Sequence, residues 1–335
     1  MNIIEEVLSA CVSSARAEPI KLRLNNGKFR TIPSQLNVML LMPSGAGKTT
    51  LLTEANVENI VEINDYTYPA IIGTISKQGE VVPGYVMKAA GKCLWIDEFH
   101  SLASNSRRAL LSLISHQKAT RVLGFKAQRP FSTSRTYIKY SIRSNELKIK
   151  YARMSVLLSG IFAPHKKKKP LIDDFAFSSR FLPIKLSTTT DEIDDMDEGK
   201  RFFNVKETEF EGGQIFEDWV KFSRCYSASV KMLPKRLREF FSDKNEFYRR
   251  NKYNLARFVT WKNREESTVT DWEFIVPYIP FFMYSTVAST LTHSEFEVFT
   301  LSKEGLSQRK IASKLSVSEA FISKIISKLK GVGLS

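Results

Sequence analysis

The chain has 335 residues, a net charge of +15 and a hydrophobic fraction of 43%. This length predicts two or three domains, and the apolar content is ample for buried cores. The three cysteines, Cys11, Cys93 and Cys225, have no metal-ligand spacing and no disulfide pattern, which indicates a reducing compartment. No secretory leader opens the chain, and the apolar stretch 274–287 is short and interrupted by two prolines. We therefore expect a soluble cytoplasmic protein, in a nucleoid or a host cytoplasm, with no membrane partner.

Most of the excess positive charge lies in one segment. Residues 117–170 contain fourteen Lys or Arg and a single acidic residue, Glu146, which gives this segment a charge of +13. A polyanionic partner such as DNA is the direct physical explanation for such a concentration of charge. A solvated basic surface without a ligand is the alternative.

A phosphate-binding loop is predicted near the start of the chain. Residues 1–35 indicate one helix, at 3–15, and an extended segment. Residues 38–41 then form a short apolar strand pattern, residues 43–50 (PSGAGKTT) a glycine-rich turn, and the following residues a helix. Strand, glycine-rich turn and helix is the context that a P-loop requires, and a chance glycine-rich turn is the alternative.

The residue types of this loop suit the phosphates of ATP. Gly45 and Gly47 let backbone N–H groups face phosphate oxygens, and the helix N-terminus adds partial positive charge. Lys48 would reach the β- and γ-phosphates, and Thr49 would bind Mg²⁺. Met42 replaces the usual first glycine, so we expect an altered entry turn and retained binding. The predicted nucleotide-binding residues are Ser44, Gly45, Ala46, Gly47, Lys48, Thr49 and Thr50.

A second apolar strand pattern, residues 93–96, ends in two carboxylates, Asp97 and Glu98. Ligands of parallel sheets bind at the carboxyl ends of the strands, so these side chains are expected beside the loop. Asp97 would organise Mg²⁺ and its waters, and Glu98 would orient and polarise the attacking water. The sequence therefore predicts an ATPase with ATP and Mg²⁺ as cofactors.

Several further segments form an ordered series. They are residues 90–99 (AGKCLWIDEF), 106–110 (SRRAL), 151–158 (YARMSVLL) and 179–181 (SRF), and Arg250 and Arg257 followed by residues 269–273 (VTDWE). Together these segments resemble, in the same order and over roughly residues 36–280, motifs of the minichromosome maintenance (MCM) helicases, which are hexameric AAA+ ATPases. The resemblance implies an AAA+ core, a helical lid and assembly into a ring.

The resemblance also implies roles for three further residues. Arg180 would act as an arginine finger on the nucleotide of a neighbouring subunit, where it stabilises charge on the γ-phosphoryl group. Arg250 would be the sensor-2 arginine of the lid. Ser159 lies near the sensor-1 position, although Ile161 occupies the closest aligned position. A solvated arginine is the alternative for both Arg180 and Arg250.

The chain departs from the MCM pattern in two other places. Residues 1–35 leave no room for the N-terminal DNA-binding domain of those helicases. Ser115 stands where their HEAMEQ helix has its glutamate. We therefore expect an MCM-like relative rather than an MCM protein.

Residues 136–151 predict a basic hairpin. Its two strands, 136–143 and 147–151, alternate between apolar and polar residues around a polar turn. The cations fall on one face, and they are Lys139, Arg143, Lys148 and Lys150. In MCM-like ATPases a hairpin at this position projects into the central pore and grips DNA. An edge hairpin whose lysines block aggregation is the alternative.

The last segment, residues 291–335, predicts three helices, at 291–304, 308–315 and 318–330. Ser307 and Ser318 are the expected N-caps of the second and third helices. The pattern resembles bacterial and archaeal winged helix-turn-helix domains with a minimal or missing wing, and such units bind DNA or, in other cases, proteins. The residues expected to face the DNA groove include Ser323, Lys324 and Lys328.

These patterns together predict an α/β fold with four parts: an N-terminal extension (1–35), an AAA+ core (36–190), a helical lid and linker (191–290) and a helix-turn-helix domain (291–335). The expected function is that of an ATP-dependent, hexameric DNA helicase or translocase acting in replication. Its small size suggests a virus, plasmid or other mobile element. The alternative is an ATP-switched DNA-binding initiator, regulator or loader that does not unwind DNA.

Overall fold

The computed structural model describes residues 3–42, 59–161, 175–185, 215–233, 238, 241, 246–263, 271–289 and 291–331. The acidic linker at 191–198 and the whole predicted phosphate loop lie outside these ranges. The loop residues concerned are Ser44, Gly45, Ala46, Gly47, Lys48, Thr49 and Thr50. Within the described ranges, no helix has both the length and the apolar content needed to cross a membrane.

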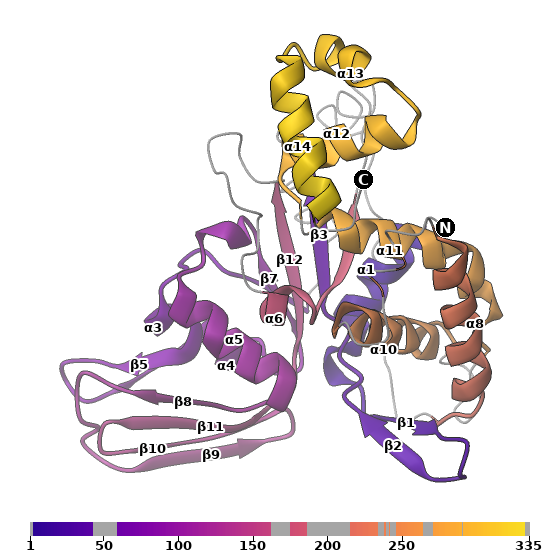
Figure 1. The fold of residues 1–335 in the computed structure, drawn as a ribbon. Coiled ribbons are helices and arrows are strands. Elements are labelled where there is room, and N and C mark those ends of the chain that lie inside the picture. Colours follow the sequence, from indigo (N-terminus) through magenta and orange to yellow (C-terminus); the bar gives the residue numbers. More distant parts are fainter. Residues whose placement is uncertain are drawn as a thin grey trace.

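A five-stranded parallel sheet forms the centre of the molecule (Figure 1). Its strands, in the order in which they lie, are β13 (Leu182–Lys185), β3 (Val38–Met42), β12 (Ser155–Ile161), β7 (Cys93–Ile96) and β4 (Ile60–Glu62). The chain leaves β3 for the β4 edge and then returns through β7 and β12 to β13 on the other side. The connections that leave the neighbouring strands β3 and β12 therefore run in opposite directions, and the carboxyl ends of these two strands mark the place where such sheets bind ligands.

Apolar residues that lie on both sides of the sheet explain why β3 and β7 could be recognised in the sequence. All four residues of β7 are buried, which is expected for a central strand covered on both faces. The N-terminal helix α1 (Ile3–Ser13) packs against β3, β7 and β12. Its Cys11 Sγ lies 3.9 Å from Cys93 Sγ. The helix expected at residues 3–15 is thus present, and the 3-10 turn η1 (Ser14–Arg16) completes it.

Further helices lie between and after these strands in the chain. Helix α5 (Ser104–His116) follows the short 3-10 turn η2 (Phe99–Ser101), and the one-turn helix α6 (Phe175–Ser178) leads into β13. Helix α11 (Ile279–Ala288) packs along β13. It contains most of the apolar stretch 274–287.

A second sheet, with four antiparallel strands, lies to one side of the parallel sheet (Figure 1). Its order is β8 (Ala119–Val122), β11 (Glu146–Ala152), β10 (Ile138–Arg143) and β9 (Phe131–Arg135). The predicted hairpin forms its two central strands, and the turn between them places Ser144 at a φ of 51°. The outer strands β8 and β9 were not predicted. Beside this sheet lies a small hairpin, β5 (Gly73–Ile75) and β6 (Val81–Pro83), between the short helices α3 (Tyr68–Ile72) and α4 (Tyr85–Lys88).

The N-terminal extension adds a third sheet. Strands β1 (Ile20–Arg23) and β2 (Phe29–Ile32) form an antiparallel hairpin, and β14 (Ile215–Phe216) pairs with β1. The helices α8 (Trp219–Met232) and α10 (Glu246–Lys262) and the 3-10 segment η3 (Glu273–Tyr278) follow. Aromatic rings hold them together, because Trp219 stacks on Tyr253 at 5.4 Å and Phe222 meets Trp272 edge to face.

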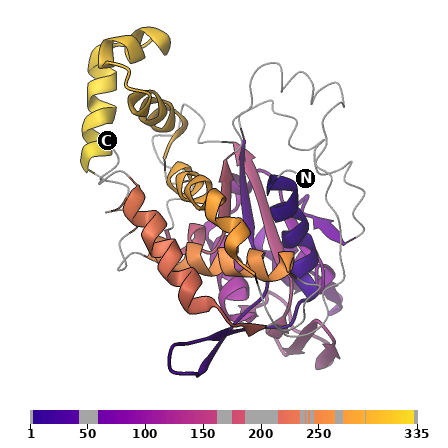
Figure 2. The ribbon, with the colours of Figure 1, turned by 90° about the vertical axis from the view of Figure 1, so that its right-hand side faces the viewer.

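Three helices end the chain: α12 (His293–Lys303), α13 (Gln308–Lys314) and α14 (Glu319–Gly331). Figure 2 shows them at one end of the molecule, beyond α11. The expected N-caps are confirmed, since Ser307 Oγ accepts a hydrogen bond from Lys310 N and Ser318 Oγ accepts one from Phe321 N. Thr292 and Glu295 bond reciprocally at the start of α12, which is a capping box. The fold is therefore mixed α/β with a parallel sheet and a C-terminal helical region.

Candidate functional site

The carboxyl edge of the parallel sheet brings Asp97 and Ser159 together. Asp97 follows the last residue of β7, and Ser159 lies near the end of β12, the strand between β7 and β3. The Ser159 hydroxyl donates a hydrogen bond to Asp97 Oδ1 at 2.7 Å, and it accepts one from the indole Nε1 of Trp95 at 2.8 Å. Ser159 is fully buried. This chain of donors fixes the orientation of the Asp97 carboxylate.

The backbone turns sharply at Glu98. Its φ of 44° and ψ of 44° lie in the left-handed region, which residues other than glycine rarely adopt. The turn exposes the Glu98 side chain, and the Glu98 N–H bonds Asp97 Oδ1 at 2.9 Å. The next residue, Phe99, is buried against Gly160, where a Cβ atom would lie 2.7 Å from the Phe99 ring. Strained backbone of this kind is concentrated at functional sites.

Tyr66 joins this edge, although the sequence analysis did not single it out. The pKa of its hydroxyl is raised, first by burial and then by the negative charges of Asp97, Glu98 and Glu62. Ser106 holds the Tyr66 backbone by donating to its carbonyl oxygen at 3.2 Å. Tyr66 follows β4, whose place beside β7 becomes apparent only from the strand order.

The chemistry of this edge suits Mg²⁺. The ion typically takes one or two protein carboxylates, and waters and substrate phosphates complete its octahedron. Asp97 is oriented at the strand end, and the parallel strand β3 ends at this same edge of the sheet. Asp97 would therefore hold the ion, and exposed Glu98 would face the water around it.

The arginines predicted for catalysis lie elsewhere. Arg180 Nε donates to Ser115 Oγ at 2.7 Å, and Arg180 also donates to the Ala176 carbonyl oxygen. Arg180 and Arg250 line one pocket of about 300 Å³, which also includes Asn37, the residue before β3. This pocket is at the amino ends of the strands, opposite Asp97. Strands of four to five residues separate the two edges by roughly 15 Å.

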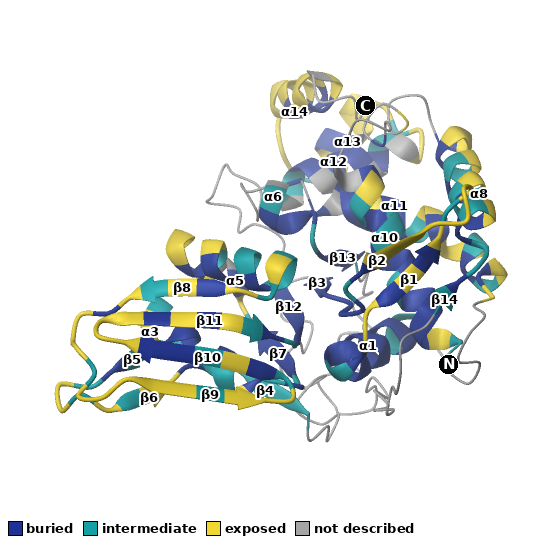
Figure 3. Ribbon diagram, turned by 90° about the horizontal axis from the view of Figure 1, so that it is seen from below, coloured by how far each residue is buried: buried dark blue, intermediate teal, exposed yellow. Residues whose placement is uncertain are grey.

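The basic hairpin residues share one solvent-facing side. Lys139, Arg143, Lys148 and Lys150 are exposed, whereas Ile138, Ile142, Leu147 and Ile149 are buried. Exposed residues occur along all four strands of this sheet (Figure 3). The two-sided pattern of the hairpin is therefore confirmed, and the cations of this face come from its two central strands.

Of the three residues expected at the DNA groove, two are exposed and the third contacts another helix. Ser323 and Lys324 are exposed on α14. Lys328 instead donates to Glu295 of α12, whose side chain is only 8% exposed. Lys328 thus ties two helices of the C-terminal unit together.

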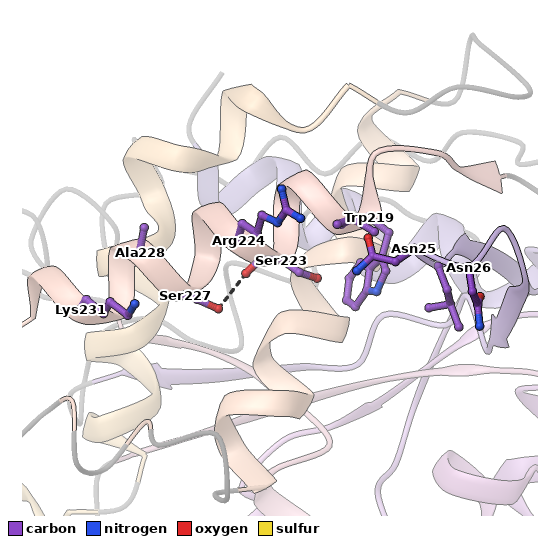
Figure 4. A pocket seen from close by; sticks show the side chains of 10 residues that line it. Asn25, Asn26, Trp219, Ser223, Arg224, Ser227, Ala228 and Lys231 are labelled. Carbon is purple, nitrogen blue, oxygen red and sulfur yellow. Dashed lines mark hydrogen bonds between the residues drawn. The ribbon is translucent and has the colours of Figure 1, made fainter.

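A larger hollow, of about 610 Å³, lies between the β1–β2 turn and α8 (Figure 4). Its polar lining includes Asn25, Asn26, Arg224 and Lys231, and Ser227 Oγ donates to the Ser223 carbonyl oxygen within it at 2.8 Å. The described residues that line this hollow include no carboxylate. Asp97, Glu98 and Ser159 are not among the residues that line it.

Comparison with protein-family models and with curated proteins finds no match to the chain. The function must therefore be inferred from the residues that the fold brings together. These are Asp97, Glu98 and Ser159 at one edge of the sheet, Arg180 and Arg250 at the opposite edge, and the basic face of the second sheet.

Proposed function

We propose that the chain is an ATP-dependent DNA translocase or helicase, an MCM-like AAA+ ATPase that works as a homo-oligomeric ring. The hydrogen bond from Ser159 to Asp97 carries this proposal. Ser159 lies on β12, the strand between β7 and β3, so the carboxylate proposed to bind the metal lies one strand away from β3, which leads into the sequence PSGAGKTT. This is where a parallel sheet binds its ligand.

The proposed roles follow from the loop sequence for Lys48 and Thr49, and from position for Asp97, Glu98 and Ser159. Lys48 would neutralise the β- and γ-phosphates, Thr49 and Asp97 would hold Mg²⁺, and Glu98 would orient the attacking water. Ser159 would hold Asp97 in place rather than contact that water. Exposure of Glu98 suits its role, because the water it orients must reach it.

The distance between the carboxylate and arginine edges supports a ring. Arg180 and Arg250 cannot serve the nucleotide of their own chain while they lie at the amino ends of the strands. They can serve a nucleotide held at the carboxyl edge of a neighbouring copy. An interface that pairs two different edges is heterologous, and a heterologous interface closes into a ring when the rotation permits. A hexamer is the ring that the MCM resemblance implies.

The proposed DNA contacts are of two kinds. The face with Lys139, Lys148 and Lys150 would contact phosphates, which position DNA without reading its sequence. The C-terminal helices would bind duplex DNA through Ser323 and Lys324 on α14. The viral or plasmid setting and the replication role remain part of this proposal.

ATPase assays with and without forked DNA test the proposal. Lys48→Ala should abolish turnover, and Glu98→Gln should retain ATP binding and stop hydrolysis, because Asp97 still holds the ion. Glu80→Gln, at an exposed position on the β5–β6 hairpin, is the matched control and should hydrolyse ATP at the wild-type rate. Wild-type turnover by Glu98→Gln would refute the assignment of the water-activating residue.

The DNA assignment is tested by changing Lys139, Lys148 and Lys150 to Ala. Affinity for all DNA sequences should fall, and the salt dependence should flatten by roughly one unit of slope for each contact removed. Replacing three other exposed lysines, Lys21, Lys28 and Lys231, is the control. Strand displacement stimulated by DNA favours the helicase, whereas slow turnover without displacement favours the ATP-switched initiator or loader.

A further inference from the structure

The pocket at the amino ends of the parallel strands contains four arginines. We name it the arginine pocket and define it by Arg30, Arg180, Arg250, Arg257 and Asn254. We propose that it is a preformed binding site for a phosphate oxyanion, in which Arg30 and Asn254 contact the anion beside Arg180 and Arg250. This proposal rests on the proposed function only for the source of the phosphate.

The charge of the arginine pocket is one-sided. Among the described residues that line it, there is no Asp or Glu. Burial, together with the positive charge of Arg250, lowers the pKa of Arg257 to about 10, and Tyr253 opposes this shift in part. A phosphate oxyanion bound in the pocket could accept charge-assisted hydrogen bonds from several of these guanidinium groups at once.

Asn254 supplies a separate indication of a ligand. Its side-chain Oδ1 accepts a hydrogen bond from Arg257 Nη1 at 2.5 Å. Because a guanidinium only donates, the atom that faces it must be the oxygen, and the remaining atom of the amide is an NH₂ donor. This Nδ2 is buried and has no hydrogen-bond partner among the described residues. Buried donors are normally satisfied, so an acceptor such as a phosphate oxygen is expected here.

Arg30 reaches the same pocket from the N-terminal hairpin. It lies on β2, and its guanidinium carbon stands 5.2 Å from the centre of the Tyr253 ring. Tyr253 also lines the pocket, so this cation–π contact holds Arg30 at the pocket wall. The N-terminal extension thus has a role in the site, although it lies outside the segment that resembles MCM helicases.

The phosphate must come from outside the chain's own nucleotide site, because the arginine pocket and Asp97 occupy opposite edges of the sheet. We assign it to the terminal phosphate of a nucleotide held by a second copy of the chain. A free phosphate or a DNA phosphate has the same chemistry, and the experiment separates these sources.

The primary test uses full-length Lys48→Ala protein, which removes the cation of the chain's own phosphate loop, and inorganic pyrophosphate as the probe in calorimetry. Arg30→Gln and Asn254→Asp should each weaken pyrophosphate binding at least tenfold. Arg23→Gln is the matched control, since Arg23 lies on the adjacent strand and pairs with Glu217 instead. Equal pyrophosphate affinity in all four proteins would overturn the proposal.

Asn254→Asp also gives a second readout. The aspartate keeps an oxygen for Arg257 and replaces the unpartnered donor with a negative charge. In phosphate-free buffer this variant should therefore melt at a higher temperature than its parent. Such a result would show that the variant folds and that a negative charge stabilises the empty pocket. A lower melting temperature, with pyrophosphate affinity unchanged, would count against an anion site.

Two further experiments identify the source of the phosphate. In the Lys48-intact chain, Arg30→Gln should reduce ATP turnover only at protein concentrations where subunits assemble. Displacement of pyrophosphate by a short DNA duplex would instead assign the pocket to DNA and overturn the nucleotide source. The two proposals can fail separately: pyrophosphate binding without any ATPase activity refutes the proposed function alone, and ATPase activity without pyrophosphate binding refutes the arginine pocket alone.

Discussion

Arg180 donates a hydrogen bond from Nε to the hydroxyl of Ser115, 2.7 Å away, between the last turn of α5 and the start of β13. In the proposed resemblance to MCM helicases, Ser115 stands where the HEAMEQ helix of those proteins has its glutamate. The hydroxyl of Ser115 holds the guanidinium in place and brings no charge of its own. Ser115 therefore helps to orient the Arg180 side chain.

We predict that Ser115→Glu impairs ATP hydrolysis without loss of nucleotide binding. The new carboxylate would pair with Arg180 and compete with the phosphate that it serves. ATPase rates and nucleotide affinity measured over a range of protein concentrations check this outcome. Ser115→Ala is the control, because it removes the hydrogen bond and adds no charge. Full activity of Ser115→Glu in the assembled state would contradict a role for Arg180 in hydrolysis.

Ser159→Ala should raise the Mg²⁺ concentration needed for half-maximal ATPase activity. It releases Asp97 Oδ1 and leaves the buried Trp95 indole without an acceptor, at a cost of roughly 1–3 kcal/mol in stability. A Mg²⁺ titration and a urea denaturation curve measure the two effects. Ser155→Ala, at the opposite end of the same strand, controls for the loss of a buried hydroxyl. The proposed positioning role fails if both variants require the same Mg²⁺ concentration.

Lys324→Ala and Lys328→Ala should differ, although both were expected at the DNA groove. Lys328 pairs with Glu295, so its loss leaves a nearly buried carboxylate without that partner and should destabilise the C-terminal unit by roughly 1–2 kcal/mol. Lys324 is exposed, so its replacement should weaken duplex binding and leave the melting temperature unchanged. Thermal unfolding and DNA affinity distinguish the two variants. The reverse pattern would return Lys328 to the DNA contact surface.

Lys185 makes stability depend on pH. Burial lowers the pKa of Lys185 from 10.5 to about 8, and the negative charge of Glu297 opposes this effect only in part. Between these two values the unfolded chain holds a proton that the folded chain has lost, so the free energy of unfolding rises with pH across this window. Below it, the charged lysine reduces stability.

Lys185→Met should therefore raise the melting temperature at pH 7, and this advantage should shrink steadily between pH 8 and pH 10.5. Melting curves at intervals of half a pH unit measure the trend. Lys21→Met, at an exposed position, is the control and should show no such trend. An advantage that does not change with pH would contradict the cause assigned here.

The elements that the sequence predicted well have local signals. The run CLWIDE shows both a buried strand and the carboxylates that end it, because burial on two faces requires uninterrupted apolar residues. Ser307 and Ser318 predict where helices begin, because a serine side chain can cap the first turn of a helix. The basic hairpin has strict alternation, which fixes the face of each residue.

The features that the sequence did not predict depend on contacts between distant segments. Strand β9 (FSTSR) has no fully buried residue, so its sequence lacks the alternation that identifies a strand. Tyr66 meets Asp97 only because β4 pairs with β7. Arg30 and Asn254 are separated by more than two hundred residues, and nothing local to either one indicates the other. Candidate residues could be named from the sequence, whereas the arginine pocket could not.

The central place of β3 has a consequence for biosynthesis. Both strands that pair with β3, β12 and β13, lie more than a hundred residues later in the chain. At roughly 5–20 residues per second, a ribosome needs on the order of ten seconds to deliver them. During that interval an apolar strand with two open edges emerges into the cell, and such edges invite aggregation. The nascent chain should therefore need a chaperone until residue 185 has left the ribosome tunnel.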